Sequence, residues 1–393
     1  MISLRSDSSL IDIEGLYTKL QTSEASEIRL PIHLKHGGTF GITSAIVQLV
    51  STWARNNPNG RLSPYGSNSG VESYIELLQQ PHGLIACYMA PHLVDSKGTE
   101  FKKHEILVQA TRYIEAMQSS KFRQTMKGRG ATLTCFAGAK NEFLSPLYER
   151  NNLEGMRGVG DFEDLAKKLV EVCDPSALRN MPDTFTQSLG LLIRELFENT
   201  NDHATSNEYG RKYTWDFPNV RGILAKYISF APNSKDATSN EAIASFADAP
   251  HRIFFQRAII NSKEDKTINF IELTVLDSGP GIAKRWLAHL NSNENIGNVS
   301  IEVEEKLVRE TFELGKTSKL INGTGVGLDT VILCLNRLKS LLRLRTGRLC
   351  LYQDFSSGNN RSFEPIHWLR DKRELSRTEG TSFSILIPIS SKV

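Results

Sequence analysis

The sequence predicts an α/β protein in two parts, with one α/β unit over residues 1–150 and a second over 181–393. Two observations support this class. Compact apolar runs bounded by glycine, such as ATLTCFAG from Ala131, are typical of strands. They alternate with segments whose apolar residues recur at helical spacing. A length of 393 residues favours two domains.

The first part alternates strand-like and helix-like segments. We expect strands at the apolar run Ile28 to Leu34 and at GLIACYMA from Gly83, and helices from Thr43 and over Glu105 to Met117. This alternation predicts a regulatory or interaction domain over 1–150. It resembles the STAS-like domains that accompany some bacterial regulatory ATPases.

Two segments look like connections. Residues 151–180 are charged and contain DFEDLAKKLVEVC, which predicts a linker helix. A strong helix is expected to begin near Thr184 or Thr186. The polar stretch from Thr205 to Asp265 looks like an insertion that carries one strand, KYISFA.

The composition is ordinary for a folded soluble protein, with 39% hydrophobic and 23% charged residues. Five scattered cysteines without a CxxC pair indicate buried or free thiols in a reducing compartment. The N-terminus lacks a signal-like apolar core, and no apolar run reaches about 18 residues, so we expect a cytoplasmic protein that does not enter membranes. A net charge of +3 neither requires nor excludes nucleic acid.

Four short motifs in the second part contain residues suited to chemistry. The first is ELFENTNDHA (195–204). On a helix its apolar face comprises Leu189, Ile193, Leu196 and Phe197. The adjoining stripe comprises Glu195, Asn199 and Asp202, with His203 beside it, while Arg194 and Glu198 are expected on the solvent side. A half-exposed amphipathic helix with a polar flank is the alternative interpretation.

The spacing within this motif suits a metal-dependent reaction. Glu195 and Asn199 are one helical turn apart, so their side chains are neighbours. A carboxylate and an amide oxygen placed in this way can hold a hydrated Mg²⁺. The carboxylate can also accept the proton of an attacking water.

The second motif is DSGPGI (277–282), which follows the predicted strand FIELTVL. Asp277 would stand at a strand end beside Gly279 and Gly281, with Ile282 closing the motif. A flat ring could approach glycine closely and donate from an exocyclic amine to the carboxylate. The alternative is a Gly-Pro turn capped by an aspartate.

The third motif is GTGVGL, which opens the predicted helix DTVILCLNRL and comprises Gly323, Thr324, Gly325, Val326, Gly327 and Leu328. Small residues before a helix offer backbone N–H groups to anionic oxygens. Lys319 lies just upstream, within reach of a terminal phosphate. A dinucleotide-binding fingerprint does not fit, because no strand directly precedes the motif and the partner acid is absent. A Walker loop does not fit either, because position 310 is glutamate.

The fourth motif is GTSFSILIP from Gly380, in which Thr381 opens a strand near the C-terminus. Alone it predicts an edge strand that stops at Pro388.

Together, and in this order, the four motifs resemble those of the GHKL ATPases (gyrase, chaperone, histidine kinase and MutL). The resemblance covers about 180–390. The first motif is similar to that of MutL proteins and topoisomerases, and its ending is similar to that of anti-sigma-factor kinases. The implied fold of 181–393 is a Bergerat α/β sandwich, with a mixed, mainly antiparallel sheet and helices on one face.

The resemblance also implies roles for single residues. Glu195 would be the general base that activates water, and Asn199 would ligate Mg²⁺. Asp277 would recognise the adenine amino group in a pocket shaped by Gly279 and Gly281. Thr381 would assist beneath the adenine.

The phosphate side of the site follows from the same resemblance. Residues 283–322 would form an ATP lid that brings Lys319 near the γ-phosphate. The three glycines that would cradle the phosphates are Gly323, Gly325 and Gly327. Asp202 and His203 belong to a part of the motif that varies among subfamilies.

The predicted function is Mg²⁺-dependent binding and hydrolysis of ATP, with lid closure driving an N-terminal partner-binding module. A protein partner is expected, and a homodimer is a further option. An anti-sigma-type protein kinase and a non-hydrolysing, ATP-gated interaction protein are the alternatives. The two-part architecture would suit bacterial regulation or phage defence.

Overall fold

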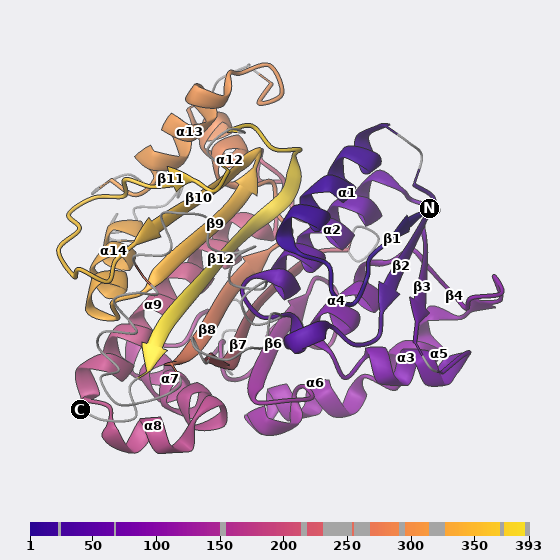
Figure 1. The fold of residues 1–393 in the computed structure, drawn as a ribbon, viewed down its shortest axis with the longest axis horizontal. Helices are drawn as coiled ribbons and strands as arrows, with labels where there is room; N and C mark the ends of the chain where they lie inside the picture. The colour runs from indigo at the N-terminus through magenta and orange to yellow at the C-terminus, as the bar shows by residue number, and fades with distance from the viewer. Residues whose placement is uncertain are drawn as a thin grey trace.

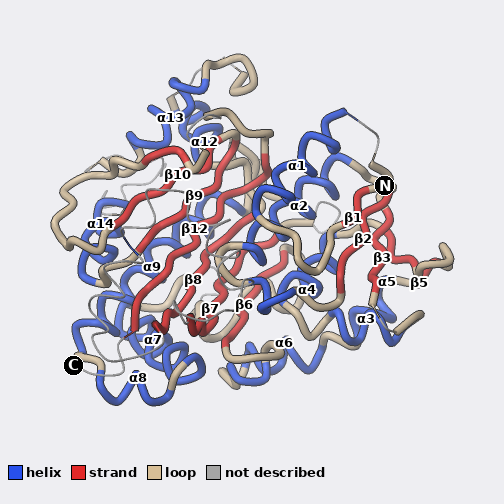
Figure 2. The backbone as a smooth tube through the Cα atoms, viewed as in Figure 1, coloured by secondary structure: helices blue, strands red, loops and turns tan. Residues whose placement is uncertain are grey.

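The computed structural model contains two β-sheets flanked by helices (Figure 1). It describes residues 1–22, 25–66, 68–149, 155–213, 218–230, 254, 268–290, 295–313, 327–369 and 373–389. In Figure 2 the smaller sheet lies near the N-terminus and the larger sheet fills the middle of the molecule. The α/β class is therefore confirmed.

The smaller sheet is mixed. Its strands follow one another in chain order: β1 (Ile2–Ser3), β2 (Glu27–Pro31), β3 (Arg61–Tyr65), β4 (His92–Val94) and β5 (Glu100–Phe101). The first four are parallel, and β5 runs antiparallel to β4.

The helical segments of this first unit are α1 (Leu10–Thr22), η1 (Lys35–Gly38), α2 (Ile42–Asn56), α3 (Val71–Leu77), α4 (Pro81–Met89), α5 (Lys103–Val108), α6 (Thr111–Gln118) and η2 (Phe122–Gln124). The helix expected from Thr43 is α2. The helix expected over Glu105 to Met117 is two helices, α5 and α6. The strand expected at GLIACYMA is wrong, because this run forms α4, whose first residue is Pro81. Nearly every α4 residue is buried, so its helical period is hidden in the sequence.

The larger sheet is antiparallel throughout. Its strand order is β11 (Ile366–His367), β10 (Leu349–Asp354), β9 (Leu341–Gly347), β12 (Thr378–Ile389), β8 (Ile268–Asp277), β7 (Val220–Phe230) and β6 (Gly130–Phe136). The expectation of a mixed sheet is therefore corrected. The motif strand β12 is central and not at an edge. Proline has no N–H to donate to a neighbouring strand. Pairing of β12 with β9 ends at Leu386, so Pro388 lies beyond the part of β12 that bonds to β9.

The sheet boundary does not coincide with the expected division at residue 150. Strand β6 pairs with β7 and so belongs to the larger sheet. The segment expected to be a linker, 151–180, contains α7 (Val159–Cys173) and α8 (Pro175–Asn180), and α7 packs against the motif helix α9 (Asp183–Ala204) and against β6 and β7. Pairing between β6 and β7 joins residues about 90 positions apart, which no local sequence signal encodes.

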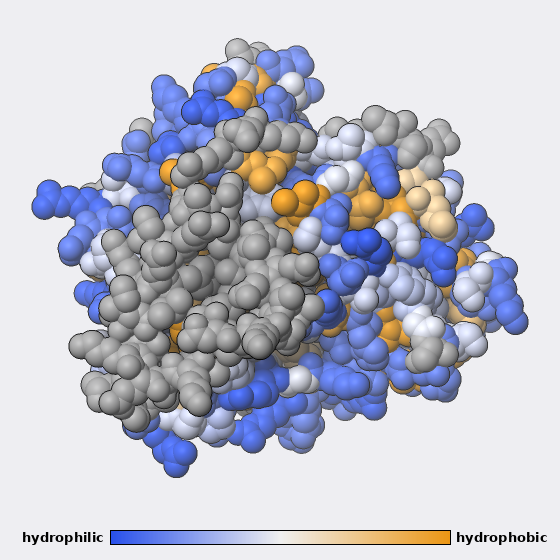
Figure 3. All heavy atoms as spheres, in the orientation of Figure 1, coloured by the Kyte–Doolittle hydropathy of each residue, from blue (hydrophilic) through white to orange (hydrophobic). Residues whose placement is uncertain are grey.

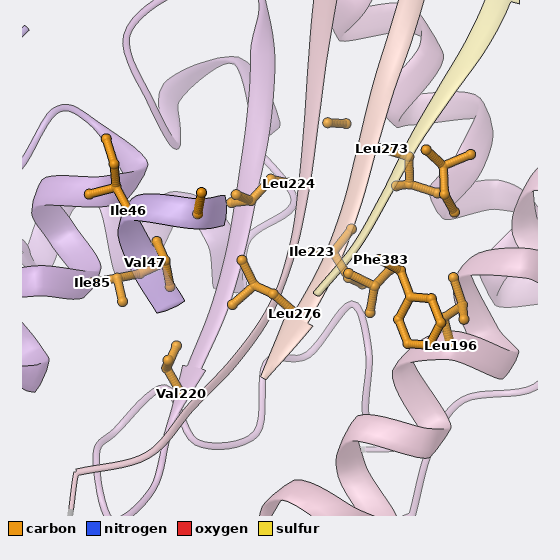
Figure 4. Close-up of a cluster of buried hydrophobic side chains, with 14 of the residues drawn as sticks. Ile46, Val47, Ile85, Leu196, Val220, Ile223, Leu224, Leu273, Leu276 and Phe383 are labelled. Atoms are coloured by element: carbon orange, nitrogen blue, oxygen red, sulfur yellow. The ribbon is translucent and has the colours of Figure 1, made fainter. Parts of the chain in front are cut away.

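One face of the larger sheet is apolar and packs against helices. Helices α7 and α9 contact β7, and α9 also contacts β8. Helix α14 (Leu328–Arg337) packs against α9. Figure 4 shows Leu196 of α9 beside Phe383 of β12. The buried side chains on this face include Leu133, Ile223, Leu273, Val275, Phe383 and Ile385, and their removal from water stabilises the layer by about 25 cal/mol per Å² of apolar surface.

The opposite face is covered as well, so the expectation of helices on one face is corrected. Helix α2 contacts β12, and α4 contacts β6 and β7. In Figure 4, Ile46 and Val47 of α2 lie on the same side of the sheet as Leu224 of β7. This face also carries buried polar side chains in register on adjacent strands, namely Lys226, Glu272, Ser384, Arg343 and Arg345.

All of these buried polar groups except Arg343 find hydrogen-bond partners in the first 60 residues. Lys226 Nζ donates to the Gly37 carbonyl at 2.7 Å and to Thr43 Oγ1 at 2.6 Å. The Glu272 carboxylate accepts the N–H groups of Phe40 and Gly41. Buried polar groups need such partners, because an unpaired one costs about 1–3 kcal/mol. The first unit is therefore fixed to the sheet by specific contacts as well as by apolar packing.

A buried ion pair adds to this interface. Arg345 is paired with Glu14 of α1 by two bonds, at 2.8 and 3.0 Å. Arg345 also donates to the carbonyls of Gly347 and Ser376, and its own carbonyl accepts from Gln48 of α2 at 3.1 Å. A bidentate Arg–carboxylate pair fixes the geometry of both elements.

On one face, the surface of the protein is mostly polar where the structure describes it. Where the face in Figure 3 is coloured by hydropathy, it is mostly hydrophilic, with small apolar groups over α1 and beside α12 (Ile282–His289). Scattered apolar residues of this kind are normal on a protein surface. All five cysteines are buried and free. Among the described helices, none has the length and apolar character needed to cross a membrane.

We predict that Glu14→Ala lowers the free energy of unfolding by about 3 kcal/mol, because it leaves the Arg345 guanidinium buried without its carboxylate. Urea unfolding followed by circular dichroism measures this change. The matched control, Glu105→Ala, removes an exposed carboxylate from α5 and should change stability by at most about 1 kcal/mol. Equal effects of the two substitutions would contradict a structural role for the buried pair.

Candidate functional site

Helix α9 carries the first motif and sets the position of its polar side chains. Its apolar residues Leu189, Ile193, Leu196 and Phe197 are all buried, as predicted. The side chain of Glu195 is 12% exposed. The expected positions of Arg194 and Glu198 are corrected, because both are only partly exposed and interact with the site. Arg194 Nη1 lies 2.7 Å from Glu195 Oε1 and 3.2 Å from Glu198 Oε2.

Asn199 is held in one orientation by its own helix. Its Nδ2 donates to the Glu195 carbonyl one turn earlier, at 2.8 Å. This bond directs the amide nitrogen to the backbone and leaves Oδ1, the atom suited to a hard cation, for another partner. Asp202 is half-buried and acts electrostatically on Arg285 of α12. The side chain of His203 lies outside the described residues.

The second motif forms a tight turn at the end of β8. Asp277 is 8% exposed, and its Oδ1 accepts the N–H of Gly279 at 2.7 Å. Burial raises the pKa of the Asp277 carboxyl to about 7, against the opposing effects of the Gly279 and Thr381 N–H groups. Gly281 has a φ of 84°, a conformation that favours glycine, and α12 begins at the next residue, Ile282.

The fourth motif lies directly against the second. The N–H of Gly380 donates to the Gly279 carbonyl at 2.7 Å. A side chain at Gly380 would overlap the carbonyl of Asp277, so this close approach requires glycine. Thr381 is the register partner of Asp277 on the neighbouring strand. The two motifs therefore form one turn-on-strand unit.

A row of side chains crosses the end of the sheet at this point. Arg221, Asp277, Thr381 and Thr346 are register partners on β7, β8, β12 and β9. Thr346 Oγ1 lies 3.2 Å from Thr381 Oγ1 and accepts the N–H of Ile282 at 3.1 Å. Arg221 and Thr346 lie in none of the four motifs and could not be predicted as neighbours of Asp277, because only strand register brings them to it.

The described part of the third motif lies against the first. Gly327 and Leu328 are described, and Leu328 begins α14. A Cβ added at Gly327 would lie 3.9 Å from both Asn199 Nδ2 and Glu195 Oε2. The other predicted phosphate-binding residues, Lys319, Gly323, Thr324, Gly325 and Val326, lie outside the described residues.

The first and second motifs also meet. A Cβ added at Gly279 would lie 2.7 Å from the Cα of Ala204, at the end of α9. The described parts of all four motifs are therefore neighbours: the first with the third at Gly327, the first with the second at Gly279, and the second with the fourth at Gly380.

The described part of the expected lid is packed on the sheet. It forms α12 and α13 (Ile301–Glu310), which contact β9 and β10. Glu304 of α13 is 1% exposed and pairs with Arg348 at 2.6 Å. Residues 291–294 and 314–322 of the expected lid lie outside the described residues.

Comparison of the chain with models of known protein families, with curated protein sequences and with solved structures gave no match. Within the described ranges, no cluster of three or more His, Cys, Asp or Glu side chains is arranged to hold a metal ion.

The raised pKa of Asp277 predicts a pH dependence of stability. Its ordinary pKa is 3.8 and its folded value is about 7, so folding favours the neutral carboxyl. The resulting stabilisation is complete below the unfolded pKa and is lost as the pH rises through 7. From pH 4 to pH 8 we expect the unfolding free energy of the wild type to fall relative to Asp277→Asn by about 4 kcal/mol at most.

Urea unfolding of both proteins at several pH values measures this difference. If the unfolding free energies of the two proteins keep a constant difference from pH 4 to pH 8, burial does not raise the pKa of Asp277.

Proposed function

We propose that the second part of the chain binds ATP in the manner of the GHKL ATPases and hydrolyses it with Mg²⁺. The observation that supports this proposal is the convergence of the four motifs. They are spread over 194 residues of sequence, from Glu195 to Pro388, yet their described parts contact one another at Gly327, Gly279 and Gly380. A structural role for each motif separately would not require these three meeting points.

The Asp277 turn is suited to an adenine ring. The carboxylate can accept a hydrogen bond from the exocyclic amine, and Gly279 and Gly281 carry no side chain that would block a flat ring. Thr346 and Thr381 supply hydroxyl groups on the adjacent strands. A carboxylate would disfavour guanine, which presents a carbonyl oxygen at the same ring position.

The phosphates would lie toward the start of α14. A helix N-terminus preceded by small residues binds anionic oxygens through free N–H groups. Asn199 Oδ1 would be the protein ligand of Mg²⁺, with phosphate oxygens and waters completing the shell. Mg²⁺ is usually held in this way and needs no cluster of protein carboxylates. When bound, Mg²⁺ neutralises charge on the phosphate oxygens. The roles of Lys319 and Gly323 to Val326 stay predictions.

Glu195 would act as the general base. Its carboxylate accepts a proton from water as the water oxygen bonds to the γ-phosphorus. The bond from phosphorus to the bridging oxygen breaks, and its electron pair leaves with ADP. Glu195 is close enough to Gly327 for this task and is mostly shielded from solvent. Lid closure, a homodimer and a partner bound by the first unit stay predictions, as does the STAS-like resemblance of residues 1–150.

One observation favours the non-hydrolysing, ATP-gated alternative. Arg194 pairs with Glu195 at 2.7 Å. An adjacent guanidinium stabilises the charged carboxylate and so weakens it as a base. In this alternative the protein binds ATP and changes its interactions without releasing phosphate, unless Arg194 moves away from Glu195.

We predict that Glu195→Gln lowers the rate of phosphate release from Mg-ATP by about 100-fold or more, because it removes the general base. ATP affinity should stay within about threefold, because Gln keeps the shape of Glu. A phosphate-release assay and calorimetric titration of ATP measure the two quantities. The matched control, Asp164→Asn, replaces an exposed carboxylate on α7 and should behave as the wild type.

Undiminished phosphate release by Glu195→Gln would overturn the assignment of the base. ATP binding by the wild type without any phosphate release would favour the gated alternative.

A further inference from the structure

The last turn of α2 reaches the candidate nucleotide site from the first unit. Arg55 lies in this turn, and its side chain is 7% exposed. Its Nη1 lies 2.6 Å from Glu379 Oε2, at the start of β12. The same nitrogen lies 3.5 Å from the carbonyl oxygen of Gly279, in the turn that presents Asp277. A residue outside all four motifs therefore contacts Gly279 of the second motif and Glu379, the residue directly before the fourth.

A third contact extends this set. The Arg55 guanidinium lies 5.0 Å from the centre of the Tyr213 ring, a distance suited to a cation–π interaction. Tyr213 is bonded through its N–H to the carbonyl of Thr205, directly after α9. One side chain thus touches the segments that follow α9 and β8 and the segment that begins β12.

The partners of Arg55 are themselves held against α2. The N–H of Glu379 donates to Thr52 Oγ1 of α2 at 3.0 Å. The next residue, Gly380, donates to the Gly279 carbonyl that Arg55 also approaches. A displacement of α2 would therefore alter the support of the Asp277 turn.

Charged groups near this turn also act on the Asp277 carboxyl. The groups that act electrostatically on Asp277 are Arg55, which lowers its pKa, and Glu379, which raises it. The N–H groups of Gly279 and Thr381 lower it further, and Tyr213 lies near enough for Asp277 to raise the pKa of its phenol. Arg221 is the neighbour of Asp277 on β7.

We propose that Arg55 is a positioning residue of the nucleotide site, supplied by the first unit, which holds the Gly279 turn in place for recognition of the adenine. This inference rests on the proposed function. With this role for Arg55, the affinity for ATP depends on the position of α2 on the larger sheet. Because coupling between two sites is reciprocal, ATP would in turn change the affinity of the first unit for any partner that moves α2. The first unit is then a regulator of ATP binding and not a separate module.

The test measures ATP affinity by calorimetric titration from pH 6 to pH 9. ATP binding should weaken as the pH falls below a midpoint near 7, where the Asp277 carboxyl becomes neutral. Arg55→Met should weaken ATP binding by about 10-fold, because the charge-assisted contacts to the turn are lost, and should move the midpoint to higher pH. Arg55→Lys keeps the charge and should restore much of the affinity.

Glu379→Gln provides a second arm that does not depend on the folding of Arg55→Met. Because Glu379 raises the pKa of Asp277, this substitution should move the midpoint to lower pH, opposite to Arg55→Met. General damage to the fold would not produce opposite shifts. The control Arg61→Met removes an exposed arginine from β3 and should leave both affinity and midpoint unchanged.

Failure of this inference is distinguishable from failure of the proposed function. If the wild type binds ATP, Asp277→Ala does not, and Arg55→Met matches the wild type in affinity and midpoint, then Arg55 has no positioning role. If the wild type does not bind ATP, or Asp277→Ala binds it as tightly as the wild type does, the proposed function and this inference both fall.

Discussion

The fold depends on covering a sheet face that carries charge. Lys226, Glu272 and Arg345 lie on one side of the larger sheet and are almost fully buried. Their partners come from the first 60 residues, through Thr43, the N–H groups of Phe40 and Gly41, and Glu14. Charges in such surroundings must be paired, because each unpaired ion would cost several kcal/mol. This requirement fixes α1 and α2 on the sheet.

The position of α2 then has a consequence for the site. Its last turn ends beside Glu379 and the Gly279 carbonyl, so the first unit meets the segments that carry the second and fourth motifs. The apolar face of the same sheet positions α9, which brings Glu195 and Asn199 to the start of α14. The candidate site thus lies at one end of a sheet whose two faces are covered by different parts of the chain.

Much of the candidate site could be predicted from the sequence, because its residues lie in short motifs with strong local signals. Glycine before a helix, an aspartate at a strand end and polar residues one turn apart are all visible locally. The residues missed, Thr346, Arg221 and Arg55, have no such signal. Strand register brings the first two to Asp277, and packing between the two units brings the third.

The errors in the predicted fold also arise where the sequence carries no local signal. The sequence predicts a strand at the run from Gly83, whereas the run forms the helix α4. Burial on nearly all sides of α4 removes the alternation of apolar and polar residues that would identify a helix. The sequence places strand β6 in the first unit, whereas its partner β7 lies about 90 residues further along the chain. Sequence patterns predict element type when one face is exposed, and they carry little information on which distant strands pair.

In the proposed site, the Asp277 turn recognises adenine while the start of α14 receives phosphates. The most direct measurement is a crystal structure of the protein with Mg²⁺ and a non-hydrolysable ATP analogue. We expect the adenine amino group within hydrogen-bonding distance of the Asp277 carboxylate and the phosphates between Asn199 and Gly327. An analogue bound elsewhere, or crystals that contain none at saturating concentration, would contradict the claim.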